Sequence, residues 1–162
     1  LAVNPSDVAT VLTAMEAEIV TNKRREKIGD MMKKAHCRLV EEDEIVTEIV
    51  VPASIREYRT GYDKYRVRDS HDFAVVSVAS AYKLEDGKVA DARIVLGAVA
   101  PIPLRATAAE EFINGKEITE ELAGQAAEIA LRGAVPLSKN EYKVQIARSL
   151  VKNSLLNAAA AR

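Results

Sequence analysis

The chain has 162 residues, enough for one domain with a substantial core or for two small lobes that share a surface. Its 23 basic and 24 acidic residues are interspersed, so the charge pattern indicates neither a nucleic-acid nor an anionic-membrane surface. The apolar stretches are strand-sized, and no signal peptide is evident. The single cysteine, Cys37, excludes an internal disulfide. These three observations make the cytoplasm the default location.

The first fifty residues predict a helix followed by β structure. Ser6 or Asp7 is suited to cap a helix of about three turns, because a short oxygen-bearing side chain can accept from the free amides of the first turn. A β-hairpin is expected over residues 17–28, and a strong strand from Glu44 that ends before Pro52. The acidic run 41–44 predicts a solvated loop, since it lacks the spacing of a calcium loop.

An antiparallel sheet is predicted next. The first of its strands should carry Tyr62 and Lys64 on one face, because side chains alternate along a strand. The two strands that follow read as a long hairpin with Asp86-Gly87 at the turn. The three strands are expected near residues 58–67, 73–82 and 89–99.

Three helices are predicted after the sheet. Thr107 and Glu110 have the spacing of a capping box for the first, and Thr119 is suited to cap the second. The third is expected from Glu141 to about Ala160, with one apolar stripe. The predicted class is therefore α+β.

One continuous segment carries a specific resemblance. Lys64, Arg66 and Arg68 precede His71-Asp72-Phe73-Ala74, and after the hairpin comes the run Leu96-Gly97-Ala98-Val99-Ala100-Pro101-Ile102-Pro103-Leu104-Arg105-Ala106. This pattern resembles the C-terminal half of the FAD-binding (medium) subunit of the molybdenum hydroxylases, a family that includes xanthine dehydrogenase and the carbon monoxide dehydrogenase flavoprotein.

The resemblance implies a two-part organisation. Residues 1–54 would be the C-terminal part of the FAD-binding domain, a partial α/β lobe. Residues 55–162 would be a CO dehydrogenase flavoprotein-like C-terminal domain, an antiparallel sheet plus a three-helix bundle. The function implied is electron transfer from iron–sulfur clusters through FAD to an external acceptor such as NAD, with the molybdopterin and iron–sulfur centres in partner subunits.

Three positions are implied to contact the cofactor. Asp7 matches an acidic residue that accepts a hydrogen bond from a hydroxyl of FAD. Val46 matches an apolar residue packed on the isoalloxazine ring, and Lys64 matches a lysine near the pyrimidine edge, where a cation would stabilise a reduced flavin. No catalytic or metal-ligating residue is predicted.

The resemblance also implies that the FAD site is incomplete, because the family's glycine-rich pyrophosphate loops fall upstream of Leu1. The alternative is a non-catalytic module that docks against partner subunits and binds no cofactor in this form. Read from the residues alone, Lys64 could be a solvated strand lysine. Asp72 is expected to have a structural role, accepting from turn amides or pairing with Arg66 or Arg68.

Overall fold

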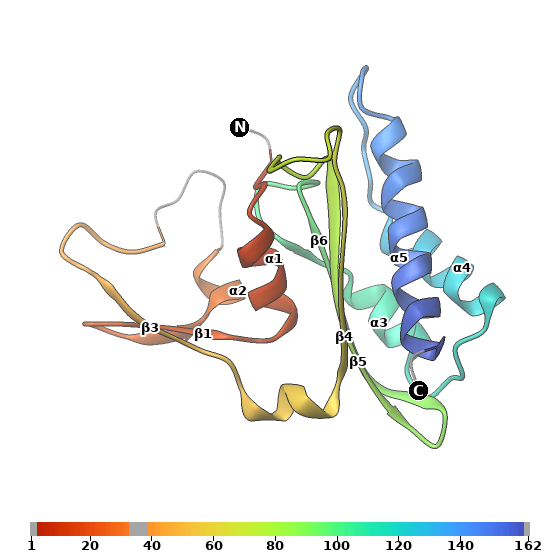
Figure 1. The fold of residues 1–162 in the computed structure, drawn as a ribbon, viewed down its shortest axis with the longest axis horizontal. Helices are drawn as coiled ribbons and strands as arrows, with labels where there is room; N and C mark the ends of the chain where they lie inside the picture. The colour runs from red at the N-terminus through yellow and green to blue at the C-terminus, as the bar shows by residue number, and fades with distance from the viewer. Residues whose placement is uncertain (1–2, 33–38, 161–162) are drawn as a thin grey trace.

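The computed structural model describes residues 3–32 and 39–160, and the chain folds into two antiparallel sheets with helices on either side of the larger one (Figure 1). Cys37 lies outside the described residues. The elements, in chain order, are α1 (Asp7–Ala14), β1 (Glu18–Thr21), β2 (Arg25–Lys27), α2 (Ile28–Met31), β3 (Val46–Val50), the 3-10 helix η1 (Ala53–Glu57), β4 (Arg59–Tyr65), β5 (Val76–Glu85), β6 (Lys88–Gly97), β7 (Leu104–Arg105), α3 (Thr107–Ile113), α4 (Glu120–Ala130) and α5 (Tyr142–Ala160).

The smaller sheet has the strand order β2-β1-β3, all antiparallel. Strand β1 lies in the middle, and its Ile19 packs with Ile28 and Met31 of α2 and with Ala9 of α1. Strand β3 is an edge strand whose residues are largely exposed. The hairpin expected over residues 17–28 is therefore present, and β3 confirms the strand predicted before Pro52.

The larger sheet has the order β4-β5-β6-β7, and its two faces are buried against different helices. One face contributes alternate residues of β5 and β6 to the main core with α3, α4 and α5, whereas Ala79 and Val95 on the opposite face pack against α1. Figure 1 shows α1 on one side of this sheet and α3 to α5 on the other. The sheet is thus the central layer, and α1 packs on its strands β5 and β6.

Two backbone features explain why these segments fold as they do. Asp86 and Gly87 both have positive φ values, 50° and 78°, as a tight turn between two antiparallel strands requires. At the end of β6, Gly97 lies so close to α1 that a Cβ atom would collide with the hydroxyls of Ser77 and Thr10. Helix α1 can approach the sheet this closely only because residue 97 has no side chain.

The predicted capping box at Thr107 and Glu110 is wrong. Residue Ala106 occupies the N-cap of α3, and no side chain caps the helix. The Glu110 carboxylate instead accepts from the amide of Ile94 at 2.8 Å and from Arg105 Nε at 2.9 Å. Because β7 is only two residues long, the Ile94 amide has no strand partner there, and Glu110 supplies the acceptor.

Other local predictions hold. The Ser6 hydroxyl accepts from the Ala9 amide at the start of α1, and Thr119 accepts from the Leu122 amide at the start of α4. The mixed composition of helices and antiparallel sheets is therefore confirmed. The finer description of a partial FAD-binding lobe followed by a three-helix bundle stays a prediction.

Candidate functional site

Asp7 is fixed at the first turn of α1 by the segment that precedes it. The Asn4 amide donates to the Ala100 carbonyl, and the Ala98 amide donates back to the Asn4 carbonyl, so this segment is held against the loop after β6. The Ser6 cap then orients the first turn. A carboxylate at this end of a helix also interacts favourably with the helix dipole.

Lys64 reaches Asp7 from the larger sheet. It lies near the end of β4, and its Nζ is 2.6 Å from Asp7 Oδ2. The two residues are 57 positions apart in sequence, and their side chains retain 18% and 38% of their exposure, respectively. The fold therefore brings two of the three predicted cofactor residues into one partly buried ion pair.

The surroundings of this pair favour the charged form of Asp7. Burial acts to raise the pKa of Asp7, but the hydrogen bond from Lys64, the nearby Tyr62 hydroxyl and the positive charges of Lys64 and His71 outweigh it and lower the pKa below its usual 3.8. Burial, followed by the neighbouring Asp7, raises the pKa of Tyr62. Tyr62 and Lys64 do share one face of β4, as predicted.

One oxygen of this carboxylate lacks a partner. Asp7 Oδ1 is buried and has no hydrogen-bond partner among the described residues. A buried acceptor without a donor costs free energy, so this atom is suited to receive a hydroxyl or amide donor from another molecule.

Val46 lies apart from this pair, at the start of edge strand β3. Val46 is 45% exposed, and Ile45, Ile49 and Val51 nearby are also large exposed hydrophobic residues. No described hydrogen bond, ion pair or core cluster joins Val46 to Asp7 or Lys64. The structure thus unites Asp7 with Lys64 and leaves Val46 on a separate apolar edge.

Asp72 lies in the loop after β4 and has the structural role that the sequence predicts for it. Its Oδ2 accepts from Arg68 Nε at 3.1 Å, and its Oδ1 accepts from the Phe73 amide at 2.9 Å. The hydrogen bond from Arg68 and the Phe73 amide lower the pKa of Asp72 although desolvation opposes them. Asp72 therefore closes the loop that leads from β4 to β5.

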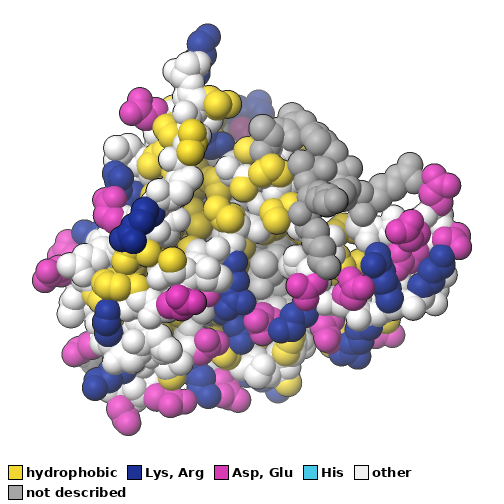
Figure 2. All heavy atoms as spheres, turned by 180° about the vertical axis from the view of Figure 1, so that it is seen from behind, with side chains coloured by type: hydrophobic (Ala, Val, Ile, Leu, Met, Phe, Trp, Pro, Cys, Tyr) yellow, Lys and Arg dark blue, Asp and Glu magenta, His cyan; other side chains and the backbone are white. Residues whose placement is uncertain are grey.

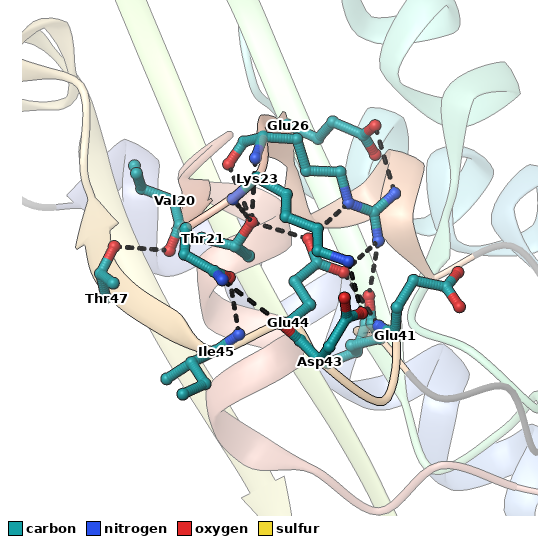
Figure 3. Close-up of polar contacts among 12 residues, drawn as sticks. Val20, Thr21, Lys23, Glu26, Glu41, Asp43, Glu44, Ile45 and Thr47 are labelled. Atoms are coloured by element: carbon teal, nitrogen blue, oxygen red, sulfur yellow. Dashed lines mark hydrogen bonds and ion pairs between the residues drawn. The ribbon is translucent and has the colours of Figure 1, made fainter.

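The acidic run 41–44 differs from the predicted solvated loop at Glu44, whose side chain is fully buried. Its carboxylate accepts from Arg24 Nε at 2.8 Å, from the Thr21 hydroxyl at 2.6 Å and from the Glu41 amide at 2.9 Å (Figure 3). These three donors, Arg24 first, lower the pKa of Glu44 to about 2.

This cluster ties the acidic loop to the β1–β2 hairpin. Lys23 pairs with Asp43, and the Asn22 side chain both accepts from the Ile45 amide at 2.9 Å and donates to the Asp43 carbonyl at 3.3 Å. The cluster therefore positions β3 and its Val46. Within residues 3–32 and 39–160, no group of three or more His, Cys, Asp or Glu side chains is arranged to hold a metal ion.

Sequence reasoning missed a second charged network beneath α1. Arg105 Nη1 lies 3.2 Å from Glu16 Oε1, and Arg93 Nη2 lies 3.6 Å from Glu16 Oε2. Arg93 also stacks on the Tyr58 ring, with its guanidinium carbon 4.5 Å from the ring centroid. These residues join the end of α1 to β6 and β7, and their spacing in sequence offers no signal for it.

Comparison with known proteins agrees with this architecture. The family described as the CO dehydrogenase flavoprotein C-terminal domain matches residues 61–158, most of the chain from β4 to α5. The chain belongs to this family. The segment that carried the resemblance in sequence lies within the matched range.

Individual relatives extend the match toward the N-terminus. The chain is 35% identical to the glyceraldehyde dehydrogenase medium chain of Sulfolobus acidocaldarius, covering 72% of this chain and 42% of that protein. It is 32% identical to the carbon monoxide dehydrogenase medium chain of Hydrogenophaga pseudoflava, covering 97% of this chain and 57% of that protein.

A solved structure shares the fold over nearly the whole chain. Quinoline 2-oxidoreductase from Pseudomonas putida 86 superposes with a TM-score of 0.84 at 26% identity, covering 98% of this chain and 57% of that one. The chain therefore spans about half the length of the proteins that it matches. No described helix is both long and apolar enough to cross a membrane.

Proposed function

We propose that this chain is the C-terminal part of the FAD-binding subunit of a molybdenum hydroxylase, the subunit through which electrons pass from iron–sulfur clusters to an external acceptor such as NAD. The observation that carries the proposal is the ion pair of 2.6 Å between Asp7 and Lys64, two positions that the family resemblance assigns to the flavin site. Membership of a flavoprotein family supports it.

The residues present suit FAD. The buried, unpartnered Asp7 Oδ1 is an acceptor that a ribose or ribityl hydroxyl could satisfy. Val46 offers an exposed, β-branched apolar surface for a flat ring. The Lys64 side chain is 18% exposed, so its charge is partly shielded from water.

FAD, when bound, supplies the redox chemistry, and the residues of this chain bind it and set the local charge. The Lys64 ammonium would stabilise the negative charge that a flavin gains on reduction. The Asp7 carboxylate opposes that effect, because it neutralises part of the lysine charge while fixing its position. The two side chains together would set how strongly the cation acts.

The wider assignment follows from the same proposal. Residues 1–54 would belong to the FAD-binding domain and residues 55–162 to the C-terminal domain of sheet and three-helix bundle. The subunits carrying molybdopterin and the iron–sulfur clusters would be separate partners, in the cytoplasm. The site within this chain is incomplete for FAD, since the family's glycine-rich pyrophosphate loops are not among its residues.

The test compares flavin retention by two purified forms. One is this chain, and the other is the same chain preceded by the N-terminal half that its relatives possess. We expect the longer form to show a flavin absorption spectrum and this chain alone to show none. A longer form that retains no flavin would overturn the proposal.

A second candidate is a docking module that binds no cofactor. The observation that favours it is the apolar edge of β3, where Ile45 and Ile49 are 69% and 52% exposed. Such an edge is suited to pairing with another polypeptide. This candidate predicts that both forms lack flavin but bind a partner subunit, so the same spectra separate the two.

A further inference from the structure

A cavity of about 420 Å³ lies on the far side of the larger sheet from Lys64, where the chain between α4 and α5 meets the loop after β6. Apolar residues dominate its lining, among them Val99, Leu104, Leu131, Val135 and Val144. The chain between α4 and α5 projects at the top of Figure 2, and hydrophobic side chains gather beside it in that view. Neither the family resemblance nor the proposed flavin site assigns a role to this cavity.

Among the residues that the structure describes, its lining contains one charged residue, Lys143, on the first turn of α5. The ammonium group donates to the Ala98 carbonyl at 2.8 Å, and no acidic side chain of the described residues forms an ion pair with it. Burial lowers the pKa of Lys143. Because an ammonium has three donors, this cation has hydrogen-bonding capacity left over in an apolar setting.

The contact to Ala98 also holds the lysine in place. Ala98 has a φ of 61°, unusual for a residue with a side chain, and its amide is bound to the Asn4 carbonyl. The Ala98 carbonyl is therefore fixed, and it directs Lys143 Nζ toward the loop that borders the cavity. A cation so fixed is prepared for an anionic ligand, since less side-chain freedom is lost on binding.

We propose that this cavity binds a small aliphatic monocarboxylate, with its tail against the apolar lining and its carboxylate on Lys143 Nζ. The volume falls in the range of small-molecule sites, which combine an apolar lining with few polar groups that orient the ligand. A single cation matches a single negative charge, whereas a dianion would leave a charge uncompensated in an apolar cavity. The proposal is independent of flavin binding.

The probe is hexanoate, with hexan-1-ol as the uncharged match. Isotope-labelled methyl groups report the site by NMR, because Val99, Leu104 and Val144 lie in the lining. We expect hexanoate to shift these methyl signals saturably. Hexan-1-ol should bind roughly tenfold more weakly, as loss of a charge-assisted hydrogen bond predicts. Absence of a saturable shift with hexanoate would overturn the proposal, and this is the result expected if only a protein partner fills the cavity. Equal affinity for the two probes would also overturn it.

Variants of the full chain locate the carboxylate. Lys143→Met should weaken hexanoate roughly tenfold and leave hexan-1-ol unchanged. The matched control is Lys152→Met, on the same helix but paired with Glu120 and outside the cavity lining, which should change neither affinity. Equal weakening by both variants would overturn the proposal.

Ala134→Phe keeps Lys143 and its contact to Ala98, and so remains informative if Lys143→Met does not fold. Residue 134 is exposed and lines the cavity, so a ring there would occupy the space for the tail. We expect this variant to lose hexanoate binding. Unchanged affinity in Ala134→Phe would place the ligand elsewhere and contradict the proposal.

Discussion

Lys64 Nζ lies 2.6 Å from Asp7 Oδ2, and this ion pair joins the first turn of α1 to strand β4 of the larger sheet. The pair is partly screened by water, because the side chains are 18% and 38% exposed. We expect a double-mutant cycle with Asp7→Asn and Lys64→Met to give a coupling free energy of about 1 kcal/mol, measured by urea unfolding. The coupling should decrease with added salt.

The matched control for this cycle is the pair Lys152–Glu120, which joins α5 to α4. Its side chains are 35% and 79% exposed, so solvent screens it more strongly. We expect its coupling to be smaller than that of Asp7 and Lys64. A coupling as small for Asp7 and Lys64 would show that the two do not form a specific pair in solution.

Acid should release the loop before β3 through Glu44. Its pKa is lowered from the usual 4.5 to about 2 by Arg24, Thr21 and the Glu41 amide. A carboxylate with a lower pKa in the folded state stabilises the fold above its unfolded-state pKa, and that contribution is lost as the pH falls toward about 2. Glu44→Gln should therefore flatten the decline of the unfolding free energy as the pH falls from 4.5 to about 2.

The same titration includes Glu48→Gln as its control. Glu48 lies on the exposed strand β3, close in sequence to Glu44 but without the three donors. We expect the Glu48 variant to keep the acid-dependent decline in unfolding free energy, because the Glu44 cluster is intact in it. If the Glu44 variant also followed the parent curve, the buried cluster would not form in solution.

Substitution of Gly97 should test how closely α1 approaches the sheet. A Cβ atom there would meet the hydroxyls of Ser77 and Thr10, so we expect Gly97→Ala to reduce the free energy of unfolding by about 2 kcal/mol. Adding Ser77→Ala should recover part of the loss, because it removes one of the two obstacles. Urea unfolding of the single and double variants measures both effects.

Gly124→Ala provides the opposite expectation. Gly124 is inside α4, and no atom lies within 4 Å of a Cβ built there. Alanine should therefore stabilise the chain by about 0.5–1 kcal/mol through the helix and the unfolded state. Equal effects of the two glycine substitutions would contradict the packing of α1 against β6.

Local sequence patterns predicted local structure well and tertiary contacts poorly. The Asp86-Gly87 turn and the Ser6 and Thr119 caps depend on residues only a few positions apart, so the sequence contains the whole signal. The Thr107–Glu110 pattern failed because a strand amide distant in sequence, at Ile94, competes for the carboxylate. Tertiary structure therefore determines that the Glu110 carboxylate binds the Ile94 amide and does not take part in a helix cap.

The candidate site shows the same limit. Family resemblance selected Asp7 and Lys64 separately, but nothing in a separation of 57 residues indicates that the two side chains pair. The pairing depends on Gly97, which lets α1 lie against the face of the sheet on which Lys64 projects. Glu44 likewise reads as one member of a solvated acidic run until Arg24 is brought beside it.

The proposed flavin site predicts opposite effects of the two members of the ion pair on the reduction potential. In the longer, flavin-retaining form, Lys64→Met removes a cation that favours the reduced flavin. The potential should fall by about 30 mV, the two-electron equivalent of ~1.4 kcal/mol. Asp7→Asn removes the anion that offsets Lys64 and should raise the potential, while the double variant should lie near the parent value.

Potentials are measured by spectroscopic redox titration with Lys152→Met as the control, since this variant removes a lysine that is paired with Glu120 instead. Shifts of the same sign for Asp7→Asn and Lys64→Met, or none for Lys64→Met, would exclude electrostatic tuning by this pair even if the flavin is retained.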